Sequence, residues 1–125
     1  MTKPVIQKTP LEYALLRAYY SRYKDVGFPR PEDMQVSSRE SSTAGRLVYL
    51  DHVGDVRLED GQLGLGTYSQ INLADVEGGA SFWVFVEDRK VIYLEIAING
   101  LGSWNGSESG WDICDPNTGI FSTSP

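Results

Sequence analysis

The chain has 125 residues, of which 41% are hydrophobic and 22% are charged, and these values are typical of a single soluble domain. Its formal net charge is −6, and the acidic excess lies in residues 51–125, which hold twelve acidic residues against three basic ones. This charge disfavours nucleic acids and anionic membranes as partners and favours a basic protein. Alternatively, the acidic excess only keeps the protein soluble.

Neither a membrane anchor nor a secretion signal is evident in the sequence. No apolar run approaches the roughly 20 residues that a membrane-spanning helix requires, and the first residues lack the apolar stretch of a signal peptide. Cys114 is the only cysteine, so no internal disulfide can form. We therefore expect a cytoplasmic protein with one domain over residues 1–125, whose ends at 1–8 and 120–125 are loose.

A helix is predicted from Thr9 to about Asp25. Thr9 is a good N-cap, Pro10 suits the first helical position, and Glu12 can complete a capping box. Leucine and tyrosine side chains recur at helical spacing after Pro10, which indicates one broad stripe that packs against the rest of the protein.

Short strands separated by turn sequences follow the helix. The sequence predicts strands at 34–40 and 46–51, a hairpin of 56–59 and 62–65 around Asp60-Gly61, a strand near 69–73 and a short edge strand at 111–114, with turns at 41–45 and 115–119.

The strongest signal is a second hairpin, formed by residues 81–86 and 91–98 around the charged sequence Glu87–Lys90. Both arms are nearly continuous in apolar residues, so we expect both faces of these strands to meet protein rather than water. Gly78-Gly79 is expected to break the chain just before the hairpin. These elements predict an α+β fold, with the N-terminal helix packed on a curved, mostly antiparallel sheet of about six strands.

Two stretches resemble a group of short, uncharacterised bacterial proteins. They are Arg39-Glu40-Ser41-Ser42-Thr43-Ala44-Gly45 and Gly79-Ala80-Ser81-Phe82-Trp83-Val84-Phe85, followed by Leu94-Glu95 and Ser103-Trp104. The pattern of that group is an Arg-Glu pair before a Gly turn, a Gly-x-x-Phe strand, a hairpin, and Leu-Glu before a tryptophan loop. Here the usual Thr is displaced to Thr43, and the hairpin tip lacks its Gly. The resemblance covers about residues 34–105; it implies a fold and a bacterial source, and it transfers no catalytic residue.

The C-terminal loop offers a candidate partner-binding surface. Trp104 and Trp111 lie in a Gly- and Ser-rich segment, with Glu108, Asp112 and Asp115 close in sequence. If exposed, such tryptophans could anchor a basic protein that the acids attract. Alternatively, both rings fold back over the open end of the sheet.

A pocket between helix and sheet is the alternative site. Its lining would include Tyr20 and Tyr23, with Glu40, His52 or Glu95 as polar groups. Two buried carboxylates that face one another could act as an acid and a base, but a carboxylate in a strand more commonly pairs with an arginine on a neighbouring strand. We expect Glu95 to pair with Arg39 or Arg46.

No catalytic, cofactor or metal motif stands out. His52 is the only histidine and no nucleophile sequence accompanies it, and the single cysteine lies far from it in sequence. We therefore expect neither cofactor nor metal. The favoured function is a non-enzymatic protein-binding module, for example an immunity-type inhibitor of a basic bacterial toxin, present as a monomer or homodimer; the alternative is a small-ligand-binding or enzymatic domain.

Overall fold

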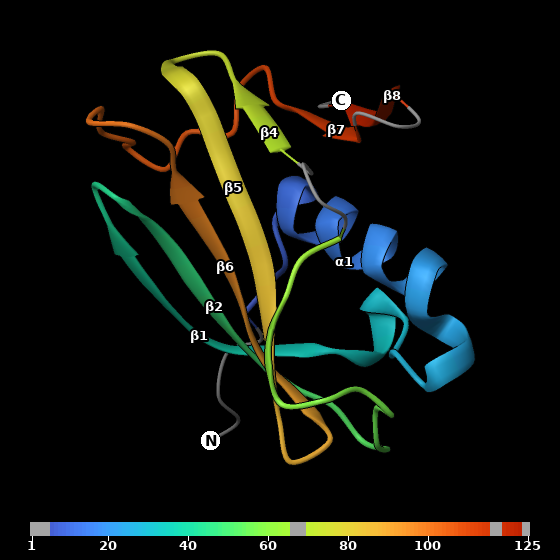
Figure 1. Ribbon diagram of the computed structural model, residues 1–125. Helices are drawn as coiled ribbons and strands as arrows, with labels where there is room; N and C mark the ends of the chain where they lie inside the picture. Colours follow the sequence, from blue (N-terminus) through green and yellow to red (C-terminus); the bar gives the residue numbers. More distant parts are fainter. Residues whose placement is uncertain (1–5, 66–69, 116–118, 124–125) are drawn as a thin grey trace.

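The computed structural model describes residues 6–65, 70–115 and 119–123. For residues 114–115 and 119–123 it describes the backbone only. One helix, α1 (Pro10–Tyr23), packs against one face of an antiparallel, open sheet, which confirms the predicted α+β class (Figure 1). The strands are β1 (Gln35–Ser42), β2 (Gly45–Asp51), β3 (Gly61–Leu63), β4 (Gln70–Leu73), β5 (Val76–Glu87), β6 (Lys90–Ile98), β7 (Asp112–Asp115) and β8 (Gly119–Thr123). Two 3₁₀ turns, η1 (Lys24–Val26) and η2 (Pro31–Asp33), connect α1 to β1.

Helix α1 begins as its sequence predicts. The Thr9 hydroxyl accepts a hydrogen bond from the Glu12 N–H, and the Glu12 carboxylate accepts one from the Thr9 N–H, so the capping box is complete. The buried side of the helix faces the sheet, and the Tyr19 hydroxyl donates to the Leu63 carbonyl of β3 at 2.6 Å. Capping and packing thus fix the helix over the middle of the sheet.

The long hairpin of β5 and β6 forms the centre of the sheet. The strand order is β1-β2-β6-β5-β4-β7-β8, and β3 also pairs with β5 beyond the end of β4. A single apolar core lies between α1 and the sheet. Its largest fully buried side chains include Tyr19, Leu11, Leu15, Leu16, Met34, Ile71, Leu94, Ile96 and Ile113.

The prediction of a hairpin around Asp60-Gly61 is wrong. Residues 56–59 form no strand, because the Val56 N–H donates to the Arg89 carbonyl and the Arg57 N–H to the Val26 carbonyl. Strand β3 pairs with β5 instead. Contacts with segments distant in sequence therefore outweigh a favourable local turn.

Two further differences concern glycine and the C-terminal segment. Strand β5 continues through Gly78 and Gly79, which adopt positive φ angles of 83° and 66°, so these residues bend the strand rather than break the chain. The predicted edge strand is internal, because β7 lies between β4 and β8. Strand β8 occupies residues that we expected to be loose, whereas most of the predicted turn at 115–119 lies outside the described residues.

Candidate functional site

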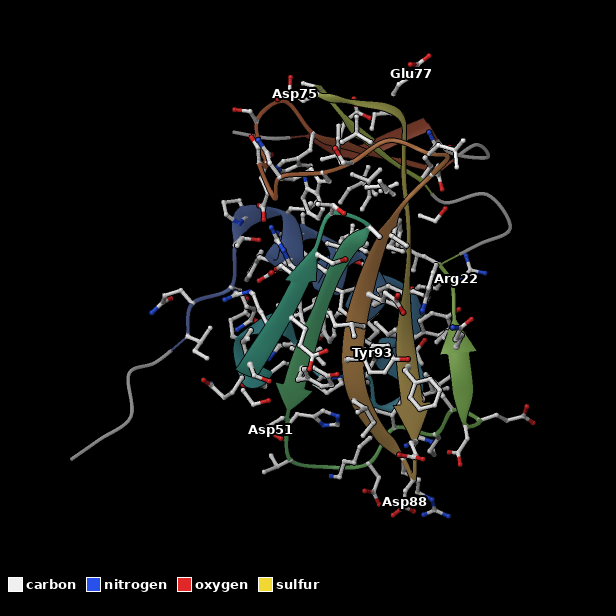
Figure 2. All side chains as sticks on the ribbon, turned by 90° about the vertical axis from the view of Figure 1, so that its left-hand side faces the viewer. Arg22, Asp51, Asp75, Glu77, Asp88 and Tyr93 are labelled. Atoms are coloured by element: carbon white, nitrogen blue, oxygen red, sulfur yellow. The ribbon has the colours of Figure 1, made fainter. Side chains whose placement is uncertain are left out.

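The sheet has two unlike faces. Helix α1 covers the inner face, and no described helix covers the outer face, which is turned toward the viewer in Figure 2. Along β2, β5 and β6, buried side chains alternate with half-buried ones, as expected when only one face is covered. The sequence predicted that both faces would meet protein, but the described residues bury only one.

Three cross-strand rows make up the exposed surface, which we call the outer patch. They are Ser38–Tyr49–Tyr93–Phe85, Glu40–Leu47–Glu95–Trp83 and Ser42–Gly45–Ala97–Ser81, contributed by β1, β2, β6 and β5 in that order. The outer patch is therefore aromatic at one end, apolar and acidic in the middle, and small and polar at the other end.

The aromatic row is a packed cluster. The Tyr93 ring stacks on Phe85 with a centroid distance of 5.2 Å, and it meets Tyr49 edge-on at 6.0 Å. All three rings are half-buried, so each presents one side to the surroundings. Tyr93 lies near the middle of the sheet in Figure 2. The three packed rings form a preformed aromatic surface of the kind that anchors protein interfaces.

The two carboxylates of the outer patch are held by aromatic donors. The indole N–H of Trp83 donates to Glu95 at 3.0 Å, and the Tyr49 hydroxyl donates to Glu40 in a longer bond of 3.4 Å. Partial burial raises the pKa of Tyr49, and the Glu40 charge raises it further. The hydroxyl therefore stays protonated and remains a donor at neutral pH.

Neither carboxylate has a basic partner within the outer patch. No residue in the three rows is basic, and the ion pairs among the described residues involve neither Glu40 nor Glu95. The expected pairing of Glu95 with Arg39 or Arg46 is absent, because the strand register places Glu95 on the outer face and both arginines on the inner face.

A hollow of about 380 Å³ opens between the two carboxylates. Its lining is Glu40, Ser41, Ser42, Ala44, Gly45, Arg46, Leu47, Glu95 and Ala97. Gly45 cannot be replaced without disturbance, since a Cβ there would lie 2.1 Å from the Ile96 carbonyl oxygen. The lining residues place the hollow over β2, at the end of the sheet where β1 turns into β2.

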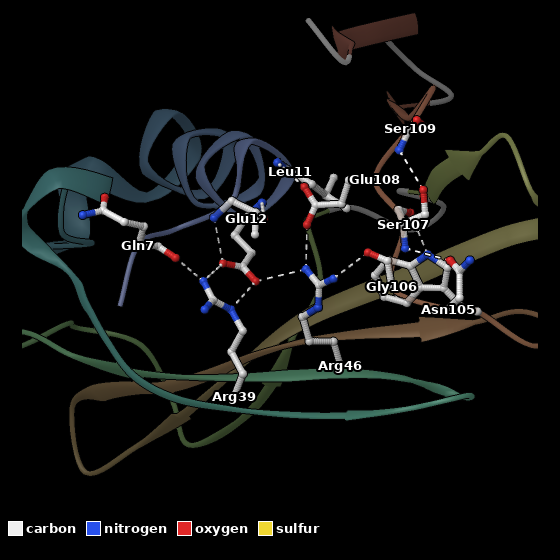
Figure 3. Close-up of polar contacts among 12 residues, drawn as sticks. Gln7, Leu11, Glu12, Arg39, Arg46, Asn105, Gly106, Ser107, Glu108 and Ser109 are labelled. Atoms are coloured by element: carbon white, nitrogen blue, oxygen red, sulfur yellow. Dashed lines mark hydrogen bonds and ion pairs between the residues drawn. The ribbon is translucent and has the colours of Figure 1, made fainter. Parts of the chain in front are cut away.

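The inner face carries a second polar cluster, which is fully matched in charge. Glu12 is completely buried and accepts from Arg39 Nε at 2.8 Å and from Arg46 Nη1 at 3.1 Å (Figure 3). Arg46 Nη1 also donates to Glu108 at 2.6 Å, and the other Glu108 oxygen accepts from the Leu11 N–H at 3.1 Å. Two arginines and two glutamates thus bind the helix N-terminus, β1, β2 and the C-terminal loop together.

Burial raises the pKa of Glu12, but this effect is outweighed. The hydrogen bonds from Arg39 and from the Thr9 N–H, together with the charges of Arg39 and Arg46, hold the pKa of Glu12 below its usual range. The buried carboxylate is therefore ionised at neutral pH.

The tryptophans of the C-terminal loop are buried rather than exposed. Trp104 and Trp111 are each 4% exposed. Trp104 lies under the Arg46 guanidinium, 4.7 Å from its ring centroid, and donates through its indole N–H to the Ser107 carbonyl at 2.8 Å. Both rings therefore fold back over the end of the sheet, which corrects the interpretation of these rings as exposed anchors.

The two described acids around those tryptophans have different partners. Glu108 is engaged with Arg46, and Asp112 accepts from the Asn72 amide at 2.7 Å. The side chain of Asp115 lies outside the described residues. Trp104 and Glu108 therefore attach the loop to the rest of the fold through Arg46.

The five residues of the alternative pocket lie in three places. Tyr20 and Tyr23 are on α1, on the inner side of the sheet, whereas Glu40 and Glu95 lie on the outer face. His52 follows β2, where its Nε2 accepts from the Val91 N–H at 2.9 Å. The structure does not bring these residues together, because the sheet separates the two tyrosines from the two carboxylates.

Sequence reasoning missed the buried role of Glu12 and the extent of the outer patch. A capping-box glutamate is common, and nothing in its local sequence shows that two arginines from other strands reach it. The outer patch did have a signal: alternate residues 81, 83, 85 and 93, 95, 97 share one face of the hairpin.

Other site types find little support in the described part of the chain. There, no three His, Cys, Asp or Glu side chains gather as they would around a metal ion, and no helix is long and apolar enough to cross a membrane. No protein-family model, curated protein or solved structure is significantly similar to this chain. The resemblance to short bacterial proteins thus stays a prediction.

Proposed function

We propose that this protein is a non-enzymatic protein-binding module that binds a basic partner through the outer patch. The observation that supports this is the packed aromatic surface around Tyr93, which lies beside two carboxylates that have no cation in the outer patch. Aromatic anchors supply most of the affinity at protein interfaces, and acidic groups around them attract a basic partner.

The near-continuous apolar sequence of β5 and β6 supports the same proposal. Strands of this composition are typical of sheets with protein on both faces, yet the described residues cover only the inner face. A partner that covers the outer patch would resolve this mismatch between sequence and burial.

A second copy of this chain fits the outer patch less well than a basic protein. In a symmetric dimer through this face, the Glu40 and Glu95 carboxylates of both copies would meet without a cation between them. Like charges at an interface oppose association. The proposed partner therefore carries the positive charge that this chain lacks on that face.

The biological setting that we propose is a bacterial cytoplasm, with a basic toxin as one class of partner. An immunity-type inhibitor needs only to bind and mask such a toxin, which agrees with the acidic net charge of −6 and with the absence of a catalytic motif in the sequence. The single cysteine agrees with a reducing compartment.

The experiment is a capture from lysate of the source cells with the tagged protein and two matched variants. Tyr93→Ser removes the central ring of the outer patch, and Tyr20→Ser removes a half-buried ring of α1 on the other side of the sheet. We expect a basic protein that the wild type and Tyr20→Ser retain, that Tyr93→Ser loses, and that elutes as the salt concentration rises. Equal recovery by all three proteins, or recovery by none, would contradict the proposal.

A further inference from the structure

The hollow between Glu40 and Glu95 has the chemistry of a cation site within the outer patch. The two carboxylates come from β1 and β6 and are separated by Leu47 of β2, so their backbones lie two strand spacings apart, about 10 Å. A cationic group placed over Leu47 would have one carboxylate on either side. Two charges of one sign around a small space favour one group of the opposite sign.

The basic residue in the lining does not fill this role. The Arg46 guanidinium lies on the inner face, where Glu12, Glu108 and the Gly106 carbonyl accept its hydrogen bonds (Figure 3). Its charge is therefore matched on the far side of the sheet. The negative charge of Glu40 and Glu95 remains available to a group that enters from outside.

The remaining lining suits the aliphatic part of a long side chain. Leu47 presents apolar atoms between the two carboxylates, and Ala97 adds a methyl group in the next row of the lining. The volume of about 380 Å³ is near the lower end of the range of roughly 300–1,000 Å³ that small-molecule sites occupy. An extended arginine or lysine can lay its methylene groups on such a surface while its charged end reaches a carboxylate.

A guanidinium matches the site better than an ammonium. Each carboxylate accepts one hydrogen bond from an aromatic donor, Glu95 from Trp83 at 3.0 Å and Glu40 from Tyr49 at 3.4 Å, and keeps acceptor capacity for a ligand. A planar guanidinium can donate two parallel hydrogen bonds to a carboxylate and can stack on an aromatic ring, whereas an ammonium acts as a point charge.

We propose that this hollow receives the side chain of one arginine of the basic partner, clamped between Glu40 and Glu95. This inference rests on the proposed function and names the chemical group that the outer patch selects. It assigns the two glutamates a role in specificity, while the aromatic row supplies the wider contact.

The test is a titration of the purified protein with acetyl-Gly-Arg-Gly-amide, followed by the ¹H–¹⁵N signals of the three tryptophan indoles. Trp83 donates to Glu95 and reports on the hollow, whereas Trp111 is buried away from the hollow and serves as the internal control. The same peptide with citrulline is the neutral control, because citrulline keeps the shape of arginine and loses its charge. The peptide with lysine distinguishes guanidinium from ammonium.

We expect a saturable shift of the Trp83 signal with the arginine peptide and none with the citrulline peptide. Glu40→Gln and Glu95→Gln should each weaken binding about tenfold, in line with the loss of one charged hydrogen bond. Glu77→Gln changes an exposed carboxylate at the start of β5 (Figure 2) that does not line the hollow, and it should leave the affinity unchanged.

Three outcomes would overturn the inference: no saturable shift, equal shifts with the citrulline peptide, or equal affinity for the lysine peptide. Such a result leaves the proposed function standing if Tyr93→Ser still loses the captured partner. Conversely, arginine-peptide binding with no loss of partner on Tyr93→Ser would remove the proposed function and retain the cation site.

Discussion

The inner and outer faces of the sheet use glutamate in opposite ways. On the inner face, Glu12 and Glu108 are matched by two arginines, and Glu12 is completely buried. On the outer face, Glu40 accepts from Tyr49 and Glu95 from Trp83, and no other described side chain donates to either carboxylate. Buried charges must be compensated within the fold, whereas charges at a surface can stay open to a partner. The difference separates the carboxylates that stabilise this protein from those that we propose it uses for binding.

The largest expected effect comes from removing the carboxylate at the centre of the inner cluster. Glu12→Ala leaves Arg46, which is 8% exposed, with one acidic partner fewer and abolishes the capping box, so we expect a loss of about 3–5 kcal/mol in the free energy of unfolding. Glu95→Ala, on the outer face, should cost less than about 1 kcal/mol. Urea unfolding of both variants measures the contrast, and equal losses would remove the distinction between the two faces.

A second pair of variants compares adjacent residues of β6. Leu94 is fully buried on the inner face, so Leu94→Ala should cost about 2–5 kcal/mol. Tyr93 is half-buried on the outer face, and Tyr93→Ser should cost clearly less, about 1 kcal/mol. The same unfolding measurement applies. A Tyr93→Ser protein as unstable as Leu94→Ala would show that the outer aromatic row belongs to the core.

Acid should act on the inner cluster through Glu12. Its pKa is lower in the folded protein than in the unfolded chain, so the unfolded chain takes up the proton first as the pH falls. The stability that the carboxylate contributes is therefore fully present above its unfolded pKa of about 4.3, and it is lost as the pH falls from there through the folded pKa. Unfolding free energies between neutral and acidic pH should decline less steeply for Glu12→Gln than for the wild type. Parallel curves would exclude Glu12 as a source of the acid sensitivity.

The smallest expected effect concerns the turn that joins β5 to β6 and should leave both faces unchanged. Asp88 and Arg89 have positive φ angles of 50° and 63°, the geometry of a two-residue turn that favours Asn-Gly. The double variant Asp88→Asn, Arg89→Gly should raise the unfolding free energy by about 1 kcal/mol. Capture of the partner should not change. A variant that gained stability and lost the partner would place the turn within the binding surface.

Local sequence signals predicted the elements that depend on neighbouring residues. Helix α1 begins at the predicted capping box, and the β5–β6 hairpin spans the predicted charged turn. The segment 56–59 was mispredicted because its bonds reach Arg89 and Val26, which are distant in sequence. Turn chemistry alone carries no information on such contacts.

The candidate site was predicted only in fragments. Glu40 and Glu95 were identified because each lies in or beside a strand that we expected to be largely buried. Their placement on one face follows from the β1–β2 and β2–β6 registers, which a single sequence does not specify. The sequence left open whether Trp104 is exposed in its Gly- and Ser-rich loop or folded back over the sheet. Its burial depends on Arg46, a residue of a distant strand.

The most direct test of the central claim is hydroxyl-radical footprinting of the outer patch in lysate of the source cells and in the purified protein. Oxidation of Trp83 and Tyr93 should be slower in the lysate, because a bound partner covers the outer patch. Because lysate scavenges hydroxyl radicals, all rates are normalised to that of Tyr20, which is also half-buried but lies on α1. Equal normalised rates for Trp83 and Tyr93 in the two samples would contradict the claim that a partner covers this face.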